Sequence, residues 1–400
     1  MKQKVVIIGH GYTSRLAIIR SVAQLGCDIT VVAMVFHGLW GRLVRSEGKP
    51  IDCCSKYVNG VKYCLVQDEE GLIKLLLDQC VDSNQKVVLI PDSDFSASVI
   101  DNHQERLKDH FLFPHINHTP GLVEHWMDKT VQKELAKKIG LNISEGKVVL
   151  VENQHYVFPT DVHYPCFTKA LATISGGKQF LKRCDNEEEL KKVLDKVSMK
   201  YNTQVLIEDY KHIDTEYALV GFSDGNHVTI PGIIEFVVNS SSHFGIAREG
   251  KIMPNTGFED LLEQFKEYVR QIGFCGLFDI DFYKSGGKMF FGEINLRFGG
   301  SGYAYTVMGA NLPAMMVRHL CGESYQDLLH DVDRTATYVN ERMCVDDFVA
   351  GHISEKEYNQ ILAAADIRFV YDPDDPKPNR KLNRYLQYQR LNRIRKKLRK

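Results

Sequence analysis

The first hundred residues alternate between short apolar runs and amphipathic segments. Residues 4–8 form an apolar run that ends in a Gly-His-Gly turn, and a helical segment follows it to about residue 25. Two more apolar runs, 28–34 and 87–91, have the length of buried strands. Because strands that alternate with helices usually form a parallel sheet, the pattern predicts an α/β domain over residues 1–117.

The middle of the chain has a different pattern, in which short alternating strands surround a few helices. Apolar residues recur every four positions between residues 127 and 139, and Gly140 stands where a helix-ending glycine is expected. Alternating strands dominate residues 147–235 around a charged helix, and another helix covers 258–272. These elements predict two α+β subdomains, a helical extension and a tail, at residues 118–207, 208–330, 331–376 and 377–400.

Residues 277–298 carry the most informative pattern, two strands joined by a glycine-rich turn. Because successive side chains of a strand point to opposite faces, the polar residues of both strands fall on one face and the apolar residues on the other. A three-residue turn at 286–288 would place Asp281 opposite Glu293. The polar face of this predicted hairpin carries Asp279, Asp281, Glu293, Asn295 and Arg297.

Such a group of oxygen ligands is a candidate metal site. Unpaired carboxylates repel one another and are costly to bury, and a hard divalent cation relieves both effects. Mg²⁺ combines protein carboxylates with substrate phosphates, so we expect Asp281, Glu293 and Asn295 to be its ligands. Arg297 is placed to hold a carboxylate or phosphate with two hydrogen bonds. The alternative is a solvated hairpin face, which explains the alternation of residues but not the convergence of these types.

The same residues resemble the metal-binding signature of the ATP-grasp superfamily, in which Glu-Ile-Asn-Leu-Arg follows an acidic residue. Here that segment begins at Glu293, twelve residues after Asp281. The superfamily includes biotin carboxylase, carbamoyl-phosphate synthetase and D-alanine–D-alanine ligase. The resemblance covers about residues 120–320 and implies an ATP-grasp fold of two α+β subdomains behind a Rossmann-like domain. It also implies ATP and two Mg²⁺ ions as cofactors, with Mn²⁺ as a substitute. Asp279 stands where several members have an uncharged residue, so the resemblance assigns it no ligand role.

Further segments resemble the superfamily's nucleotide site, in the order that the fold requires. Lys129 resembles the lysine that contacts ATP phosphates, and Lys169 the one that reaches the α- and β-phosphates. The Ser-Gly-Gly-Lys segment at 175–178 resembles the loop that closes over the triphosphate, and residues 204–210 resemble the adenine-binding hinge. Each segment alone is equally typical of a surface lysine or a turn. The residues that the resemblance assigns to ATP are Lys129, Lys169, Ser175, Gly176, Gly177, Glu208, Tyr210 and Glu216.

Three more features are similar to the D-aspartate ligase branch, which attaches D-aspartate to a lysine of a peptidoglycan precursor. They are residues 103–107, residues 113–114 and Tyr303. The resemblance implies a carboxylate–amine ligase that forms an amide through an acyl phosphate, with Arg297 as the catalytic residue that steers the acid. A free amino acid or a sugar-linked carboxylate stays open as the substrate. Candidates for the amine pocket, which has no clear signature, are Asp92, Asp94, His243 and Arg248.

Two functions of other classes stay open as well. The turn Gly9-His10-Gly11 follows a strand, as in nicotinamide-dependent oxidoreductases, but Ser14 replaces the third glycine of the dinucleotide motif. No acidic residue closes the second strand, where it would bind a ribose. A turn beside a substrate pocket fits better. The other option is a non-catalytic nucleotide-binding protein.

The composition is that of a globular protein, with 44% hydrophobic and 25% charged residues. No apolar run approaches the roughly 20 residues that span a bilayer, and the apolar segment at the N-terminus is too short for a signal peptide. Ten scattered cysteines without zinc spacing indicate reduced thiols. We therefore expect a cytoplasmic enzyme with small-molecule carboxylate and amine substrates and no specific nucleic acid, with a homodimer as an option.

The charge of the chain is unevenly distributed. The formal net charge is −1, yet residues 377–400 carry eleven Lys or Arg and no acid, which leaves 39 basic and 51 acidic residues elsewhere. Apolar residues are interleaved with these cations. A cationic amphipathic helix lies on anionic membranes, which would put the protein on the inner face of the membrane. The alternative is a disordered, solvated tail.

Overall fold

The computed structural model describes residues 2–11, 13–35, 49–65, 67–171, 180–243 and 245–398. Its N-terminal part is a sheet of order β3-β2-β1-β4-β5 with every neighbouring pair parallel. Residues 5–8 and 87–91, in the two middle strands, are apolar throughout because helices cover both faces. The predicted parallel α/β domain is confirmed. Its elements are β1 (Lys4–Gly9), α1 (Thr13–Ala23), β2 (Asp28–Val35), η1 (Asp52–Cys54), β3 (Val58–Leu65), α3 (Glu69–Gln79), β4 (Val87–Pro91), α4 (Asp94–Asn102), α5 (Gln104–Leu107) and β5 (Phe111–Leu112).

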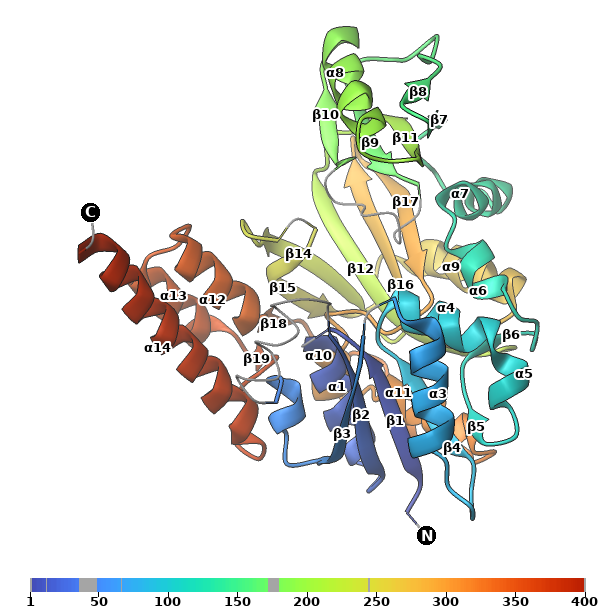
Figure 1. The fold of residues 1–400 in the computed structure, drawn as a ribbon, viewed down its shortest axis with the longest axis vertical. Helices are drawn as coiled ribbons and strands as arrows, with labels where there is room; N and C mark the ends of the chain where they lie inside the picture. Colours follow the sequence, from blue (N-terminus) through green and yellow to red (C-terminus); the bar gives the residue numbers. More distant parts are fainter. Residues whose placement is uncertain are drawn as a thin grey trace.

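A small antiparallel sheet of order β10-β9-β11-β7-β8 stands at one end of the molecule (Figure 1). Helix α8 covers one of its faces, where Leu190 and Leu194 pack on Val149 and Val205 in a buried cluster. Two helices, α6 and α7, precede this sheet. The elements are α6 (Leu122–Trp126), α7 (Lys129–Lys138), β7 (Gly146–Glu152), β8 (His155–Tyr156), β9 (Cys166–Ala170), β10 (Lys182–Cys184), α8 (Glu187–Ser198) and β11 (Thr203–Asp209).

The large central sheet has the order β17-β16-β12-β14-β15-β18-β19, with β13 paired to β12 and β6 paired to β16. Helix α9 packs on one face of it through Phe265 and Val269. The elements are β6 (His115–Ile116), β12 (Thr215–Asp224), β13 (Val228–Thr229), β14 (Ile233–Asn239), β15 (Ala247–Met253), α9 (Glu259–Ile272), β16 (Phe274–Ser285), β17 (Lys288–Asn295), α10 (Tyr303–Val307), α11 (Leu312–Leu320), β18 (Ala336–Val339) and β19 (Ile367–Arg368).

One apolar core joins the N-terminal sheet to the other face of the central sheet. Ile7 of β1, Val220 of β12 and Met315 of α11 all belong to it and are fully buried. Helix α1 contacts both α10 and α11 in the layer between the two sheets. Burial of this kind contributes about 25 cal/mol per Å². This shared core therefore holds the N-terminal domain against the sheet that contains β16 and β17.

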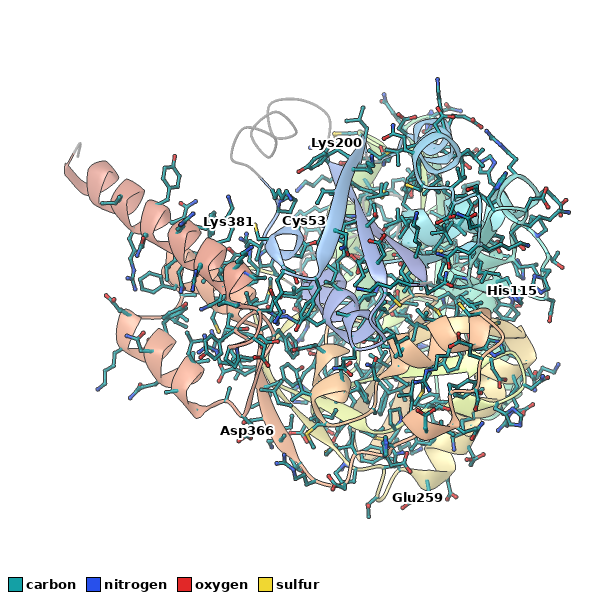
Figure 2. All side chains as sticks on the ribbon, turned by 90° about the horizontal axis from the view of Figure 1, so that it is seen from below. Cys53, His115, Lys200, Glu259, Asp366 and Lys381 are labelled. Atoms are coloured by element: carbon teal, nitrogen blue, oxygen red, sulfur yellow. The ribbon has the colours of Figure 1, made fainter. Side chains whose placement is uncertain are left out.

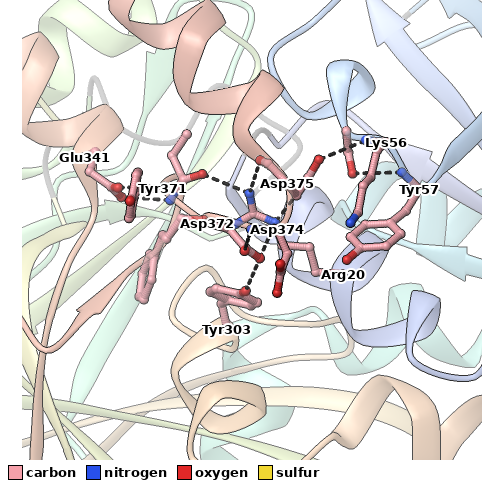
Figure 3. Close-up of polar contacts among 12 residues, drawn as sticks. Arg20, Lys56, Tyr57, Tyr303, Glu341, Tyr371, Asp372, Asp374 and Asp375 are labelled. Atoms are coloured by element: carbon pink, nitrogen blue, oxygen red, sulfur yellow. Dashed lines mark hydrogen bonds and ion pairs between the residues drawn. The ribbon is translucent and has the colours of Figure 1, made fainter.

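The C-terminal part adds strands as well as helices to the body. Strands β18 and β19, from the region predicted to be helical, extend the central sheet. Helices α12 (Glu341–Ala350) and α13 (Glu355–Ala364) follow β18, and the short η4 (Gln326–Leu328) precedes it. A buried polar cluster secures this part to α1 (Figure 3). In it, Arg20 of α1 lies 3.2 Å from Asp375 and donates to the Val370 carbonyl at 2.9 Å.

The basic tail is a helix, α14 (Pro376–Leu398), which extends away from the body (Figure 1). Figure 2 marks its start with Lys381, near Cys53 of η1, where the two elements are in contact. Leu382 and Leu386 are 1% and 5% exposed, because they pack on α12 and α13. Those two apolar residues are thus buried in contacts within the protein. In the described part of the chain, no helix is both long and apolar enough to cross a bilayer.

Candidate functional site

The hairpin β16–β17 has the register that the sequence predicts. Asp281 pairs with Glu293, and Asp279 pairs with Asn295. Paired residues of neighbouring strands point to the same face, so all four side chains lie on one face of the central sheet. Ala218 pairs with Asp281 and belongs to the core shared with the N-terminal domain. The polar group therefore lies at the edge of that core.

The turn of this hairpin differs from the three residues expected. Two glycines, Gly286 and Gly287, form it with φ values of 55° and 80°, which are typical of a type I′ turn. A two-residue turn alone would place Asp281 opposite Gly292, and a bulge at that glycine restores the pairing with Glu293. A Cβ atom at Gly292 would lie 2.7 Å from the Asp281 carbonyl oxygen, so only glycine fits there without a shift of the backbone.

Crowding perturbs the titration of the three acids on this face. Desolvation raises the pKa of Asp279 to about 7, and desolvation with the charges of Asp279 and Glu293 raises that of Asp281 well above its ordinary value. Desolvation acts on Glu293 in the same direction, but the ammonium groups of Lys129 and Lys169 outweigh it and lower its pKa. Lys129 and Arg297 also act on Asp281, and Arg297 acts on Asp279, but their charges do not outweigh the desolvation of these two acids. Asp279 and Asp281 therefore need further positive charge nearby.

Three lysines converge beside the hairpin, and the sequence identified two of them. Lys129, the first residue of α7, donates a hydrogen bond to Glu293. Lys169 of β9 lies 2.5 Å from Glu208, a buried carboxylate at the end of β11. Lys133 donates to the other oxygen of Glu208. Because Lys133 lies four residues after Lys129, both are on one face of the helix, and this spacing is the signal that would have identified it.

The ammonium groups exceed the carboxylates that pair with them. Burial and the charges of Lys169 and Lys129 lower the pKa of Lys133 to about 7. Burial and the charge of Lys129 lower the pKa of Lys169 to about 8. An anionic ligand with several oxygens would relieve this repulsion and accept charge-assisted hydrogen bonds. The group is thus suited to a polyphosphate.

Apolar residues lie next to these lysines, on the face of the small sheet opposite α8. Leu206 pairs with both Lys169 and Val148, so the three share this face. Val148 and Leu150 are 41% and 49% exposed, although they lie in the middle of a strand. An aromatic base next to a polyphosphate would find an apolar surface here.

The remaining residues assigned to ATP have more varied positions. Tyr210 follows β11, its N–H donates to the Pro165 carbonyl at 3.0 Å, and its ring lies 4.4 Å from the Arg183 guanidinium carbon. Glu216 pairs with Tyr283 across β12 and β16, on the same face as Asp281, and accepts a hydrogen bond from Asn239. The glycine-rich loop residues Ser175, Gly176 and Gly177 lie outside the described residues.

Arg297 connects the hairpin face to the N-terminal domain. Its Nε lies 2.7 Å from Oδ1 of Asp94, the first residue of α4. Among the described residues, its two terminal nitrogens make only long hydrogen bonds, of 3.4 Å to the Phe298 carbonyl and 3.5 Å to Asn295. The charge of the nearby Asp92 also acts on Arg297. Two of the four candidates for the amine pocket are therefore at this junction.

The other two candidates, His243 and Arg248, contact α12. His243 Nε2 lies 2.9 Å from Asp346, and Arg248 donates to the buried Asp347 at 3.1 Å. Ser240 donates to the same carboxylate of Asp347 at 2.8 Å. These bonds join the β14–β15 region to the C-terminal helices. A structural role therefore explains the positions of His243 and Arg248.

The expected metal ligands form an incomplete coordination shell. In the described part of the chain, no three His, Cys, Asp or Glu side chains are arranged to hold a metal ion. Asp281 and Glu293 supply carboxylates, and Asn295 supplies an amide oxygen. Such a shell fits Mg²⁺, because this ion keeps water and phosphate oxygens among its six ligands.

Comparison with known proteins agrees with this geometry. The family model described as the ATP-binding domain of the carbamoyl-phosphate synthase L chain matches residues 128–328. A D-aspartate ligase from Enterococcus faecium is 23% identical over 312 residues, which cover 72% of this chain and 73% of that protein. The large chain of carbamoyl phosphate synthase from Clostridium beijerinckii is 23% identical over 210 residues, 52% of this chain but only 20% of that protein.

Solved structures share the fold. The N5-carboxyaminoimidazole synthetase of Staphylococcus aureus, in complex with ADP, has a TM-score of 0.64 at 16% identity and covers 90% of this chain and 87% of that one. The biotin carboxylase domain of the Hydrogenobacter thermophilus 2-oxoglutarate carboxylase, with MgADP and bicarbonate, has a TM-score of 0.62 at 17% identity, with 84% and 74% coverage. Since the family model covers half of the chain, the chain belongs to the ATP-grasp ligases of the carbamoyl-phosphate synthase type.

Proposed function

We propose that the protein joins a carboxylate to an amine at the expense of ATP, through an acyl phosphate. The observation that carries this proposal is the convergence of Lys129 and Lys169 on one side with Asp281, Glu293 and Arg297 on the other. A triphosphate between them would meet cations from α7 and β9 and a metal-binding face from the hairpin. Phosphoryl transfer requires mainly such positioning and charge stabilisation.

Each group has a distinct task in this proposal. Asp281, Glu293 and Asn295 would hold Mg²⁺, which supplies positive charge to the triphosphate oxygens. Lys129 now donates to Glu293, and in the nucleotide complex it would turn to a phosphate. Because Lys133 and Lys169 occupy both oxygens of Glu208, we assign Glu208 to fixing these lysines.

The reaction then follows from the position of Arg297. Its terminal nitrogens hold the substrate carboxylate, so that one carboxylate oxygen can attack the γ-phosphorus. The bond between that phosphorus and ADP breaks, and the acyl phosphate stays beside Arg297. An amine attacks its carbonyl carbon, and phosphate leaves. Exclusion of water from the site would protect the acyl phosphate from hydrolysis.

An amino acid is the first candidate for the carboxylate substrate. The relative that covers 72% of this chain is named for D-aspartate, and a second carboxylate on the substrate would suit a site with several cations. A role in building the cell envelope would follow from the same relative. Other amino acids and sugar-linked carboxylates are the alternatives.

The decisive experiment is an ADP-release screen of the purified protein. Single D- and L-amino acids, with D-aspartate first, would be offered with ATP, Mg²⁺ and hydroxylamine, which converts an acyl phosphate into a hydroxamate. Ferric iron added afterwards forms a coloured complex with the hydroxamate. We expect hydroxamate and ADP in equal amounts with at least one acid, and none without Mg²⁺. ADP release without any hydroxamate, for every acid tested, would contradict an acyl-phosphate ligase.

A further inference from the structure

The function proposed above assigns the carboxylate substrate to Arg297 but no substrate to the N-terminal domain that this arginine contacts. In the order β3-β2-β1-β4-β5 the direction of winding reverses between β1 and β4. Sheets of this kind bind ligands at that switch point, beyond the carboxyl ends of the strands. His10 directly follows β1, and Asp94 begins the helix after β4. The switch point therefore opens onto the face that carries Arg297.

Asp94 supplies an accessible negative charge at this junction. Its contact with Arg297 spans 2.7 Å, yet the two side chains are 11% and 24% exposed, so a ligand can reach both. At the start of α4, the backbone amides of Ser93 and Ser96 are occupied, because these two serines form a capping box. An acidic group beside a guanidinium group matches a substrate pair of an ammonium and a carboxylate.

His10 is held beside this pair by the turn that contains it. Asp92 accepts a hydrogen bond from the Gly11 N–H at 3.2 Å, and a Cβ atom at Gly9 would lie 2.8 Å from Asp92 Cβ. This close packing fixes the Gly-His-Gly turn and leaves the His10 side chain exposed. Partial desolvation and the charges of Arg15 and Arg297 lower the pKa of His10, while Asp94 acts against them. The imidazole is thus neutral near pH 7 and able to accept a proton.

We propose that the amine substrate binds at the switch point as a protonated primary amine, with Asp94 pairing with its ammonium group and His10 accepting its proton. This inference rests on the proposed ligase function. It assigns the class of substrate that reacts with the acyl phosphate in the second half of the reaction. Asp94 stays within reach of Arg297, so the amine is delivered next to the acyl phosphate. Asp92, whose buried Oδ1 has no hydrogen-bond partner among the described residues, acts as a positioning residue behind the turn.

The proposed step balances in protons and bonds. The ammonium R–NH₃⁺ gives one proton to the neutral imidazole of His10 and becomes R–NH₂. The amine nitrogen then forms a bond to the acyl carbon, and the bond from that carbon to the phosphate oxygen breaks. The second nitrogen proton leaves with the phosphate as HPO₄²⁻, and His10 returns its proton to solvent.

The test separates the two halves of the reaction with two nucleophiles. Hydroxylamine is small and uncharged at neutral pH and needs no ammonium site, so hydroxamate reports acyl-phosphate formation. Amide formation with a primary amine that the wild type accepts reports the second half. The variants are Asp94→Asn and His10→Gln, with Asp94→Glu as a rescue. Asp109→Asn and His110→Ala, at exposed positions of the same domain, are the matched controls.

We expect the ratio of amide to hydroxamate to fall about tenfold or more in Asp94→Asn and His10→Gln, as for loss of a hydrogen bond to a charged group. Asp94→Glu should recover part of the ratio, and the controls should match the wild type. A wild-type ratio in Asp94→Asn, or an equal loss of hydroxamate and amide, would overturn the amine assignment. Absence of hydroxamate from the wild type would instead count against the ligase function itself.

Discussion

Lys169 forms an ion pair of 2.5 Å with the buried Glu208, although the two residues lie on different strands of the small sheet. Glu208 is 3% exposed and accepts from Lys133 as well. A buried carboxylate without a partner is costly, so two lysines make this one secure. The same arrangement leaves Lys169 within the electrostatic reach of Glu293 and Lys129. Glu208 thus fixes a cation between the small sheet and the face proposed to bind the metal.

Replacement of Lys169 should weaken ATP binding. Lys169→Met removes the ammonium group but keeps much of the side-chain volume, and we expect a loss of about 1.5–3 kcal/mol, as for a hydrogen bond to a charged group. Isothermal titration calorimetry with ATP and Mg²⁺ measures this. Lys182→Met, at an exposed position of the neighbouring strand, should bind ATP like the wild type. Equal affinities for wild type and Lys169→Met would leave this lysine without a role in nucleotide binding.

Replacing either of the two acids assigned to the metal should reduce turnover, but the two replacements should change stability differently. Asp281→Asn and Glu293→Gln should each reduce ADP release about 10²–10³-fold or more. In the absence of Mg²⁺, Asp281→Asn should melt at or above the wild-type temperature, because Asp279 and Glu293 repel that charge. Glu293→Gln should melt lower, since it loses the bond to Lys129. Near-normal turnover in either folded variant would contradict the metal assignment.

The bulge at Gly292 predicts an unusual sensitivity of one glycine. Gly292→Ala places a methyl group 2.7 Å from the Asp281 carbonyl oxygen, so the strand has to shift and Asp281 no longer faces Glu293. We expect a loss of turnover of about 10²-fold, as for a misplaced catalytic group, with the fold retained by circular dichroism. Gly300→Ala is the control, because its Cβ would meet nothing within 4 Å. Similar activities for the two variants would show that the register survives without the bulge.

Local patterns explain which parts of the fold were predictable from the sequence. The apolar runs at 4–8 and 87–91 predicted parallel strands because covered sheets have apolar residues on both faces. Strand alternation predicted that Asp281 and Glu293 share a face. The bulge was missed because its effect on the register cancels that of the shorter turn, so the three-residue turn gave the right pairing for the wrong reason.

Contacts between distant segments were less predictable from the sequence. Asp94 and Arg297 are 203 residues apart, and Lys133 and Glu208 are 75 apart. No local period links such pairs, because the packing of whole domains brings them together. Single residues could therefore be proposed as candidates, but not which of them meet. The same reason left Asp94 and His243 as equal candidates, although only Asp94 contacts Arg297.

The last prediction concerns the pH dependence of stability and a histidine outside the site. His115 of β6 stacks on His118 with 3.5 Å between the ring centroids, and in the part of the chain that the structure describes its buried Nδ1 has no hydrogen-bond partner. Burial, then the charges of His118 and His319, lower its pKa from 6.5 to about 4. Between these values the unfolded chain binds more protons, so His115 contributes stability that is complete above pH 6.5 and is lost as the pH falls toward 4.

Each pKa unit corresponds to about 1.4 kcal/mol, so this residue accounts for up to about 3 kcal/mol of the decrease. His115→Phe keeps an aromatic ring against His118 but cannot be protonated. We expect its free energy of unfolding in urea to fall less between pH 7 and pH 4.5 than that of the wild type, since all other titrating groups are shared. The difference between the two proteins isolates this one imidazole. Parallel curves of unfolding free energy against pH would therefore mean that His115 takes up its proton equally well in the folded and unfolded states.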